Sequence, residues 1–181
     1  MHGIVFVELK AYVESRLGAD AWKSLLDDQG LGHRIYLATQ PYPDEELFRL
    51  VAGIASRLGS TTSAVLKDAG KFILPDLVTV YAAYIRPEWG PLDLLERIET
   101  TVHRAVRAQS PGASPPPLQC DRVGADEVAI TYSSPRKLCE FGEGLILGVA
   151  DWWRASLHVS QQTCMLRGDD RCYIRIVQLK S

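Results

Sequence analysis

Apolar residues recur at three- and four-residue spacing through most of the first 110 positions, which predicts a helix-rich first part of the chain. Asp44 is the expected N-cap of one of these helices, and Gly70 is the expected end of the next. Pro91 is well placed to open the last one, and residues 71–86 are apolar without a clear period. We expect helices over five stretches, namely residues 3–16, 20–29, 45–58, 60–70 and 91–108.

The last part of the chain predicts strands around one further helix, over residues 137–153. A proline-dense loop over 110–117 separates the two parts. The pattern therefore predicts an α+β fold in a single domain, residues 1–181. A helical N-terminal lobe, about 1–60, is followed by a helix-plus-antiparallel-sheet lobe, about 61–181. Strands are expected at residues 118–120, 128–133, 156–165 and 171–179.

Composition narrows the class of protein. With 46% hydrophobic and 23% charged residues, the chain has the composition of a globular domain. A net charge of −2 gives no electrostatic reason to expect nucleic acid or an anionic membrane as partner. No apolar run reaches the ~20 residues that span a bilayer, and the first residues lack a basic leader and a cleavage site. We therefore expect a cytoplasmic protein, in which the four cysteines form no structural disulfides.

Tyr132, Ser134 and Arg136 form a Tyr-x-Ser-x-Arg pattern. In an extended segment, residues two apart point to the same face, so a phenol, a hydroxyl and a guanidinium would form one row of hydrogen-bond donors. Such a row suits a ligand that carries carboxylates. It equally suits a polar strand face that ends in an ordinary salt bridge, and the pattern alone leaves both interpretations open.

His103 lies about thirty residues earlier, within the helix expected over 91–108. On a helical wheel it falls roughly 60° beyond the edge of the apolar arc. Its imidazole could therefore reach into a cleft beside the helix and bind a metal ion there. A flank histidine that meets solvent or a hydrogen-bond partner is the other interpretation.

In combination, these features closely resemble the H-NOX family, the haem-nitric oxide/oxygen binding domains, in their stand-alone bacterial form. Related domains lie at the front of soluble guanylate cyclase. The histidine, the proline loop and the Tyr-x-Ser-x-Arg motif occur in the family's order and at its separations. Further matching segments are Met1-His2-Gly3, Gly18 with Trp22, Tyr42-Pro43-Asp44, Leu50-Val51, Val102-His103, residues 112–116 and residues 144–148.

The resemblance implies a haem b buried between the two lobes. By the same resemblance, His103 is the iron ligand, while Tyr132, Ser134 and Arg136 hold the propionates. Pro116 would press against the porphyrin and distort it, which tunes the iron.

The resemblance also bears on which gas is bound. Oxygen-binding members carry a tyrosine nine residues after the motif tyrosine, where this chain has Phe141. The resemblance thus implies binding of nitric oxide and carbon monoxide with weak or no oxygen binding. An oxygen-binding member stays open, because Tyr81 and Tyr84 lie in an unassigned segment. The other expected pocket residues are also apolar: Val5, Leu9, Ile73, Leu74 and Leu145.

Family members of this kind are sensors rather than enzymes. In the family, nitric oxide weakens the iron–histidine bond, and rupture of that bond moves one lobe against the other. The resemblance implies that a separate histidine kinase or cyclic-di-GMP enzyme receives the signal. A peroxidase would need acid–base groups above the haem, which the apolar set does not supply.

Cys139, Cys164 and Cys172 occupy positions where some bacterial members bind zinc. The members' fourth ligand falls at Gln161 here, and His158 is a possible substitute if the strand register allows. The three thiols could instead form a redox-responsive cluster or act as small buried apolar groups. A haem-free thiol or zinc sensor is therefore a second hypothesis. Cys120 has no partner in this scheme.

Overall fold

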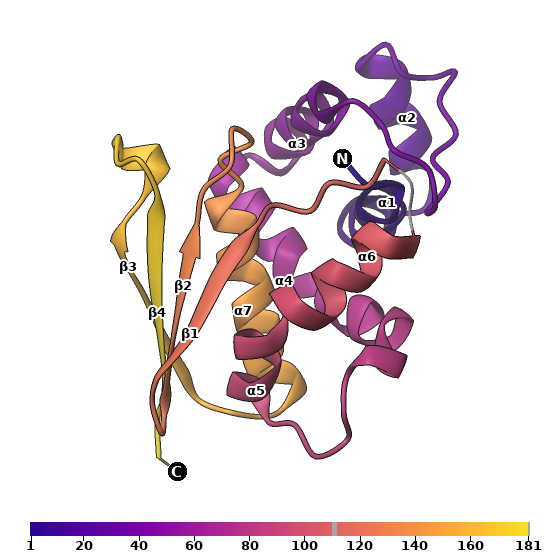
Figure 1. Ribbon diagram of the computed structural model, residues 1–181. Coiled ribbons are helices and arrows are strands. Elements are labelled where there is room, and N and C mark those ends of the chain that lie inside the picture. The colour runs from indigo at the N-terminus through magenta and orange to yellow at the C-terminus, as the bar shows by residue number, and fades with distance from the viewer. Residues whose placement is uncertain (110–111, 181) are drawn as a thin grey trace.

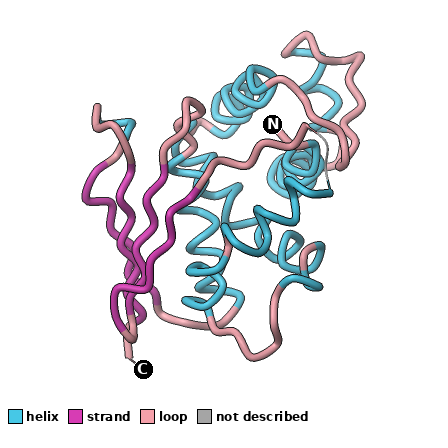
Figure 2. Tube along the Cα trace, viewed as in Figure 1, coloured by secondary structure: helices cyan, strands magenta, loops and turns pink. Residues whose placement is uncertain are grey.

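A computed structural model describes residues 1–109 and 112–180 and shows a four-stranded antiparallel sheet with helices packed on one of its faces (Figure 1, Figure 2). This arrangement confirms the α+β fold. None of the helices in the described ranges is long and apolar enough to cross a membrane. The helices are α1 (Gly3–Leu17), α2 (Ala21–Asp28), α3 (Asp44–Leu58), α4 (Thr62–Val80), α5 (Pro91–Arg97), α6 (Arg104–Gln109) and α7 (Cys139–Trp152). The strands are β1 (Leu118–Gly124), β2 (Glu127–Tyr132), β3 (Leu157–Thr163) and β4 (Cys172–Gln178), in the spatial order β1-β2-β4-β3.

Two hydrophobic cores lie on either side of a boundary within α4. The first joins α1, α2 and α3 to the first half of α4, and the second joins the rest of α4 to α5, α7 and the sheet. Val65 and Ala69 belong to the first core, whereas Leu74 and Val78 belong to the second. The lobe boundary predicted from the sequence, near residue 60, falls just before α4, and α4 contributes residues to both cores.

Helix α4 continues past Gly70, so the prediction that a short helix ends there is wrong. Gly70 is where α7 crosses α4: a Cβ at this position would lie 2.4 Å from the carbonyl oxygen of Phe141. A Cβ at Gly144 of α7 would lie 2.1 Å from the carbonyl oxygen of Lys67. Both glycines are therefore required by close packing of two backbones, and the helix does not end at either one.

The start of α4 is capped by a side chain, whereas the start of α3 lacks the cap that the sequence predicts. Thr61 Oγ1 accepts a hydrogen bond from the backbone N–H of Ala64 at 3.1 Å. Asp44, expected as an N-cap, is instead the first residue of α3, and Pro43 precedes it. The Asp44 carboxylate is engaged elsewhere, as described below.

The helix expected over residues 91–108 is interrupted. Between α5 and α6, residues Glu99–His103 form a π-helical turn, in which the N–H of His103 donates to the carbonyl of Ile98, five residues earlier, at 2.9 Å. After α6 the chain follows an irregular path from Gly112 to Pro117, and Ser110 and Pro111 of the expected loop lie outside the described residues.

Candidate functional site

A cavity of about 280 Å³ lies between α1, α4, α7, the α5–α6 segment and β2. This volume is close to the lower end of the range of about 300–1,000 Å³ that is usual for small-molecule sites. Its walls are overwhelmingly apolar, and the few polar side chains in them come from separate elements. Those with ionisable or hydroxyl groups include His2, Tyr81, His103, Ser114, Tyr132 and Arg136.

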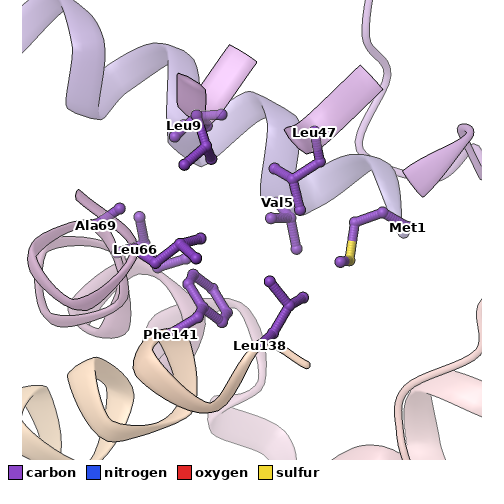
Figure 3. A pocket seen from close by; sticks show the side chains of 10 residues that line it. Met1, Val5, Leu9, Leu47, Leu66, Ala69, Leu138 and Phe141 are labelled. Atoms are coloured by element: carbon purple, nitrogen blue, oxygen red, sulfur yellow. The ribbon is translucent and has the colours of Figure 1, made fainter. Parts of the chain in front are cut away.

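The predicted pocket residues divide between two cavities. Pro116, Val5, Leu74, Phe141 and Leu145 line the main cavity. Leu9 and Ile73 line a smaller apolar space of about 10 Å³ between α1, α4 and α7, which Val5 and Phe141 also border (Figure 3). Ile4, Leu77 and Ile85 of the main cavity were not predicted from the sequence.

The π-helical turn brings His103 into the main cavity together with Val102. The extra residue in this turn rotates the helix after it, so a regular wheel misplaces both side chains relative to Ile98. His103 Nδ1 lies 3.0 Å from Oε2 of Glu99, and the side chain is 18% exposed. Burial lowers the pKa of His103, although the contact with Glu99 acts in the opposite direction. The lowered pKa favours a neutral imidazole.

Glu99 is the residue that orients His103, and the sequence analysis missed it. Its carboxylate also accepts hydrogen bonds from Arg107 at 2.7 Å and from the backbone N–H of Leu118 at 3.1 Å. Burial acts to raise the pKa of Glu99, but these donors and His103 together hold it below its usual value. A carboxylate on the second ring nitrogen is the usual partner of a metal-binding histidine. The spacing of four residues on a helix was the available signal.

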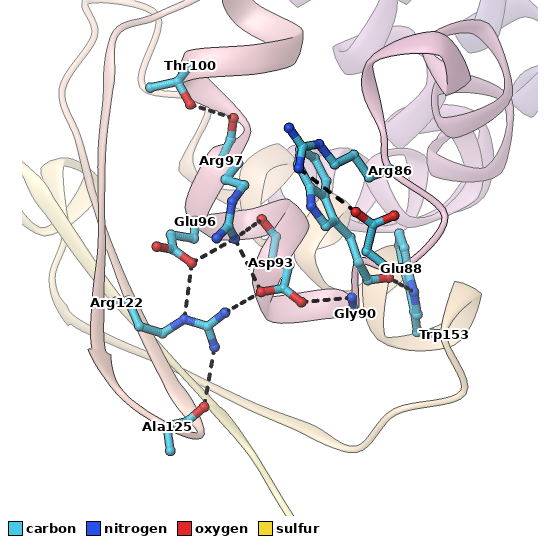
Figure 4. A network of polar contacts seen from close by, with 11 residues as sticks. Arg86, Glu88, Gly90, Asp93, Glu96, Arg97, Thr100, Arg122, Ala125 and Trp153 are labelled. Carbon is cyan, nitrogen blue, oxygen red and sulfur yellow. Dashed lines mark hydrogen bonds and ion pairs between the residues drawn. The ribbon is translucent and has the colours of Figure 1, made fainter.

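A network of charges fastens α5 to strand β1 (Figure 4). Arg122 of β1 contacts Asp93 at 2.8 Å and Glu96 at 3.2 Å. Arg97 contacts the same two carboxylates from its own helix, and Asp93 accepts from the N–H of Gly90 at 2.9 Å. The segment that leads to His103 is therefore tied to the sheet by these charge pairs as well as by the buried side chains of Leu92, Leu94 and Leu95 in the second core.

The Tyr-x-Ser-x-Arg motif does not continue as an extended segment. Strand β2 ends at Tyr132, and the N–H of Lys137 donates to the carbonyl of Ser134 at 3.1 Å, which closes a turn. Tyr132 and Arg136 line the cavity. Ser134 is buried, and its Oγ accepts from the N–H of Arg136 at 3.3 Å. Tyr132 accepts through its hydroxyl from the N–H of Leu138 at 3.0 Å.

Arg136 joins the two cores at the edge of the cavity. Its Nε donates to Oδ2 of Asp44 on α3 at 2.6 Å, and its Nη1 donates to the carbonyl of Ser114 at 2.7 Å. The amino group of Met1 contacts the other oxygen of Asp44 at 2.6 Å. Burial opposes ionisation of Asp44, yet the amine and Arg136 together lower its pKa below the usual value.

Two further polar side chains reach the cavity. Tyr81, at the end of α4, lines it and has a pKa raised by burial. His2 also lines it, and neither of its buried ring nitrogens has a hydrogen-bond partner among the described residues. Tyr84 is not among the residues described as lining this cavity.

The thiols of Cys139, Cys164 and Cys172 lie together, with all three sulfur atoms within 4.8 Å of one another. All three side chains are buried, and burial raises the pKa of Cys139 and of Cys172. In the absence of a metal these two thiols are therefore protonated and weakly nucleophilic. Cys139 also lines the main cavity. Cys120 stands apart from this cluster, and burial raises its pKa to about 12.

The strand register separates the two expected fourth ligands. Gln161 pairs with Ile174 and so shares the buried face of the sheet with Cys172, two residues away. His158 pairs with Val177 on the opposite face and is exposed, so the structure does not bring it to the thiols. The Gln161 amide donates to Glu143 of α7 at 3.0 Å.

The residues present fit an iron porphyrin. An apolar cavity with one neutral, carboxylate-oriented imidazole in its wall and an arginine at its edge matches the needs of a ligand that is apolar, metal-bearing and edged by carboxylates. The fold and the site thus define a haem-binding domain. The chain belongs to the H-NOX family: the model of the haem-NO-binding family matches residues 2–161.

Solved structures agree with this membership. The chain is similar to an H-NOX protein from S. oneidensis in the Fe(II)NO ligation state, with a TM-score of 0.93, 29% identity, and coverage of 99% of this chain and 100% of that one. The Fe(II)CO state of an H-NOX domain from the same organism gives a TM-score of 0.91 and 29% identity, with both chains fully covered. An unliganded Fe(II) H-NOX mutant from K. algicida, at 20% identity, a TM-score of 0.85 and coverage of 100% and 98%, shows the shared fold alone. No curated protein matches the chain.

Proposed function

We propose that this protein is a cytoplasmic, non-catalytic gas sensor. It binds nitric oxide and carbon monoxide at a five-coordinate ferrous haem held by His103, and it binds oxygen weakly or not at all. The observation that carries the proposal is the pairing of one half-buried, carboxylate-oriented imidazole with cavity walls that are apolar at Phe141, Leu74 and Leu145. The ligation states of the S. oneidensis structures, Fe(II)NO and Fe(II)CO, support gas binding. Four free cysteines agree with a cytoplasmic location.

Haem b would supply a ferrous iron able to bind a diatomic gas. His103 would hold the iron through Nε2, because Nδ1 faces Glu99. Tyr132, Ser134 and Arg136 would hold the propionates, with the guanidinium as the strongest donor. Pro116 lies in the cavity wall, where its stiff ring would limit how flat the porphyrin can lie.

Preference for nitric oxide over oxygen rests on the absence of a donor at position 141. A hydrogen-bond donor near the gas strengthens oxygen binding, whereas an apolar pocket leaves nitric oxide binding strong. Tyr81 supports the second candidate, an oxygen-binding member, because its phenol reaches the cavity from α4. The two candidates differ in which residue faces the gas.

Absorption spectra of the purified ferrous protein test this proposal. We expect an intense Soret band that shifts with nitric oxide and carbon monoxide and stays in place in air. Phe141→Tyr should gain an oxygenated spectrum, and Tyr81→Phe should change nothing. An oxygenated wild-type spectrum that Tyr81→Phe abolishes would establish the second candidate. A colourless protein from haem-replete expression would refute both.

The signal would pass to a separate protein, a histidine kinase or a cyclic-di-GMP enzyme, as the resemblance implies. Release of His103 would free the α5–α6 segment, and the Arg136–Asp44 pair is a direct link between the two cores that could shift with it. Kinase and cyclic-di-GMP assays with the gas-free and nitric oxide-bound protein test this part. Equal effects of the two forms on every effector would contradict it.

A metal or redox role of the thiol cluster is a further candidate, favoured by three buried sulfur atoms within 4.8 Å. Zinc would be held by Cys139, Cys164 and Cys172, with Gln161 or a water completing the site. Metal analysis of the wild type and of Cys172→Ala, with Cys120→Ala as the matched control, tests it. One zinc per chain that only Cys172→Ala removes supports the metal site; no zinc in the wild type leaves the thiol redox sensor.

A further inference from the structure

His2, a partly buried residue in the wall of the main cavity, has two buried ring nitrogens without a hydrogen-bond partner among the described residues. Both of its ring nitrogens are inaccessible to solvent, and neither forms a hydrogen bond with a described residue. Buried polar atoms in folded proteins are nearly always hydrogen-bonded, so unsatisfied ring nitrogens on a residue that lines a cavity point to a bound group that satisfies them.

The backbone around His2 is held firmly. His2 forms a bridge with Pro41, the N–H of Gly3 donates to the carbonyl of Gln40 at 2.8 Å, and the N–H of Tyr42 donates to the carbonyl of Met1 at 2.9 Å. A Cβ at Gly3 would lie 1.9 Å from the carbonyl oxygen of Leu37, which shows how closely the two segments approach. The backbone that carries the imidazole is therefore fixed before any ligand arrives, and binding has only the side chain to order.

A continuous line of contacts places His2 at the arginine edge of the cavity. The amino group of Met1, next in sequence, contacts Asp44, which contacts Arg136, which in turn contacts the carbonyl of Ser114. Arg136, Ser114 and His2 all line the same cavity. His2 thus lies in the region where the proposed function places the carboxylates of the ligand.

The charges in this region select an anion. The amino group of Met1 and the guanidinium of Arg136 are both cationic, and only one carboxylate, that of Asp44, is shared between them. Two of the five guanidinium N–H donors are used by Asp44 and Ser114, which leaves others for a ligand. A neutral imidazole donates one hydrogen bond, and a carboxylate accepts it strongly.

We propose that His2 donates a hydrogen bond to a carboxylate of the ligand in this cavity. The inference rests on the proposed function, under which that carboxylate is a haem propionate. His2 then acts as an anchor additional to Tyr132, Ser134 and Arg136, supplied by the N-terminal segment rather than by the chain after β2. The porphyrin edge would be held from both cores.

The rate of haem transfer to excess apomyoglobin tests this anchor. We expect His2→Ala to lose haem about three- to tenfold faster than the wild type, since one hydrogen bond to a charged group is removed. His2→Gln, which keeps a donor, should restore most of the retention. His33→Ala removes an exposed histidine and should match the wild type. Resonance Raman spectra should show the propionate-bending band shifted in His2→Ala alone.

Reconstitution with haem dimethyl ester separates an anchor from a structural effect. Esterified propionates carry no charge, so the difference between wild type and His2→Ala should largely disappear. An equal difference with both haems would overturn the proposal, as would unchanged release of haem b. A low-spin, two-histidine spectrum that His2→Ala abolishes would also overturn it, by making His2 an iron ligand. If the wild type binds no haem, the proposed function itself fails; if it binds haem with unchanged release, only the role of His2 fails.

Discussion

Two helical walls of the cavity are built in opposite ways. Where α4 crosses α7, Gly70 and Gly144 remove side chains so that the two backbones touch, and the helices stay regular. The wall that carries His103 is a helix broken by a π-helical turn and fastened by charged side chains. The first wall is fixed by direct contact between two backbones. The second wall combines buried leucines of α5 with charge pairs at its surface, and it carries His103 on an irregular turn. The cavity thus has one wall set by backbone contact and one set by side chains.

Replacing His103 by glycine is the change that we expect to have the largest effect on the second wall. His103→Gly should purify without haem and regain a Soret band when millimolar imidazole is supplied during expression, because the free base replaces the missing ligand. The first wall should survive, so circular dichroism should match the wild type. Full haem retention without imidazole would contradict the ligand assignment.

Gly144→Ala tests the first wall. A methyl group 2.1 Å from the carbonyl oxygen of Lys67 must push the two helices apart, so we expect about 3 kcal/mol loss in the free energy of unfolding, measured in urea. Gly142→Ala is the matched control on the same helix, because nothing lies within 4 Å of its Cβ. Gly142 borders the main cavity, so the comparison uses the haem-free protein, in which Gly142→Ala should be neutral or stabilise by about 0.5–1 kcal/mol. Equal effects of the two substitutions would contradict a first wall fixed by backbone contact.

Glu99→Gln should loosen the orientation of His103 in the second wall without unfolding the protein. The amide can still accept from Leu118 but loses the charge that orients His103 and pairs with Arg107. We expect about 10–100-fold weaker haem retention and a shifted iron–histidine stretch in the resonance Raman spectrum. Glu88→Gln, at an exposed carboxylate, serves as control. An unchanged stretching frequency would show that Glu99 does not act on the ligand.

The smallest expected effect concerns α1 and α4. Burial, followed by the neighbouring Asp76, raises the pKa of Glu8 from 4.5 to about 7. Between pH 4.5 and about 7, the folded protein keeps a proton on Glu8 that the unfolded chain has lost. The contribution of Glu8 to the free energy of unfolding is therefore fully present below pH 4.5 and is lost as the pH rises through 7. The decline should be on the order of 1 kcal/mol after solvent screening. Unfolding free energies from pH 5 to 8 should fall less in Glu8→Gln; parallel curves would exclude the titration.

The sequence predicted those parts of the fold that depend on local signals. The positions of α1, α2, α7 and the closing hairpin follow from apolar spacing and turn residues, and the structure has them within a few residues. The end of α4 could not be predicted, since Gly70 is a local signal for termination that long-range packing against α7 overrides. The π-helical turn could not be predicted either, because a regular wheel assumes the period that the turn breaks.

For the site, the sequence indicated which residues take part but not how they are arranged. The family resemblance singled out His103, Tyr132 and Arg136, and the structure places all three in the wall of one cavity. The fastening of Arg136 to Asp44 joins residues 92 positions apart, which no short pattern reveals. His2 carried no signal beyond its place in a matching segment, and the role proposed for it rests on the lack of a hydrogen-bond partner among the residues that the structure describes.

The sharing of α4 between the two cores has a mechanical consequence. A shift of one core past the other must deform α4, because the two halves of this helix are packed in different cores. Movement of one core relative to the other therefore bends α4. Its weakest point is Pro75, which lies next to the boundary between the two cores and donates no hydrogen bond to the helix ladder. A change in the angle between the two cores should therefore be centred near Pro75, within the part of α4 that also packs on α7.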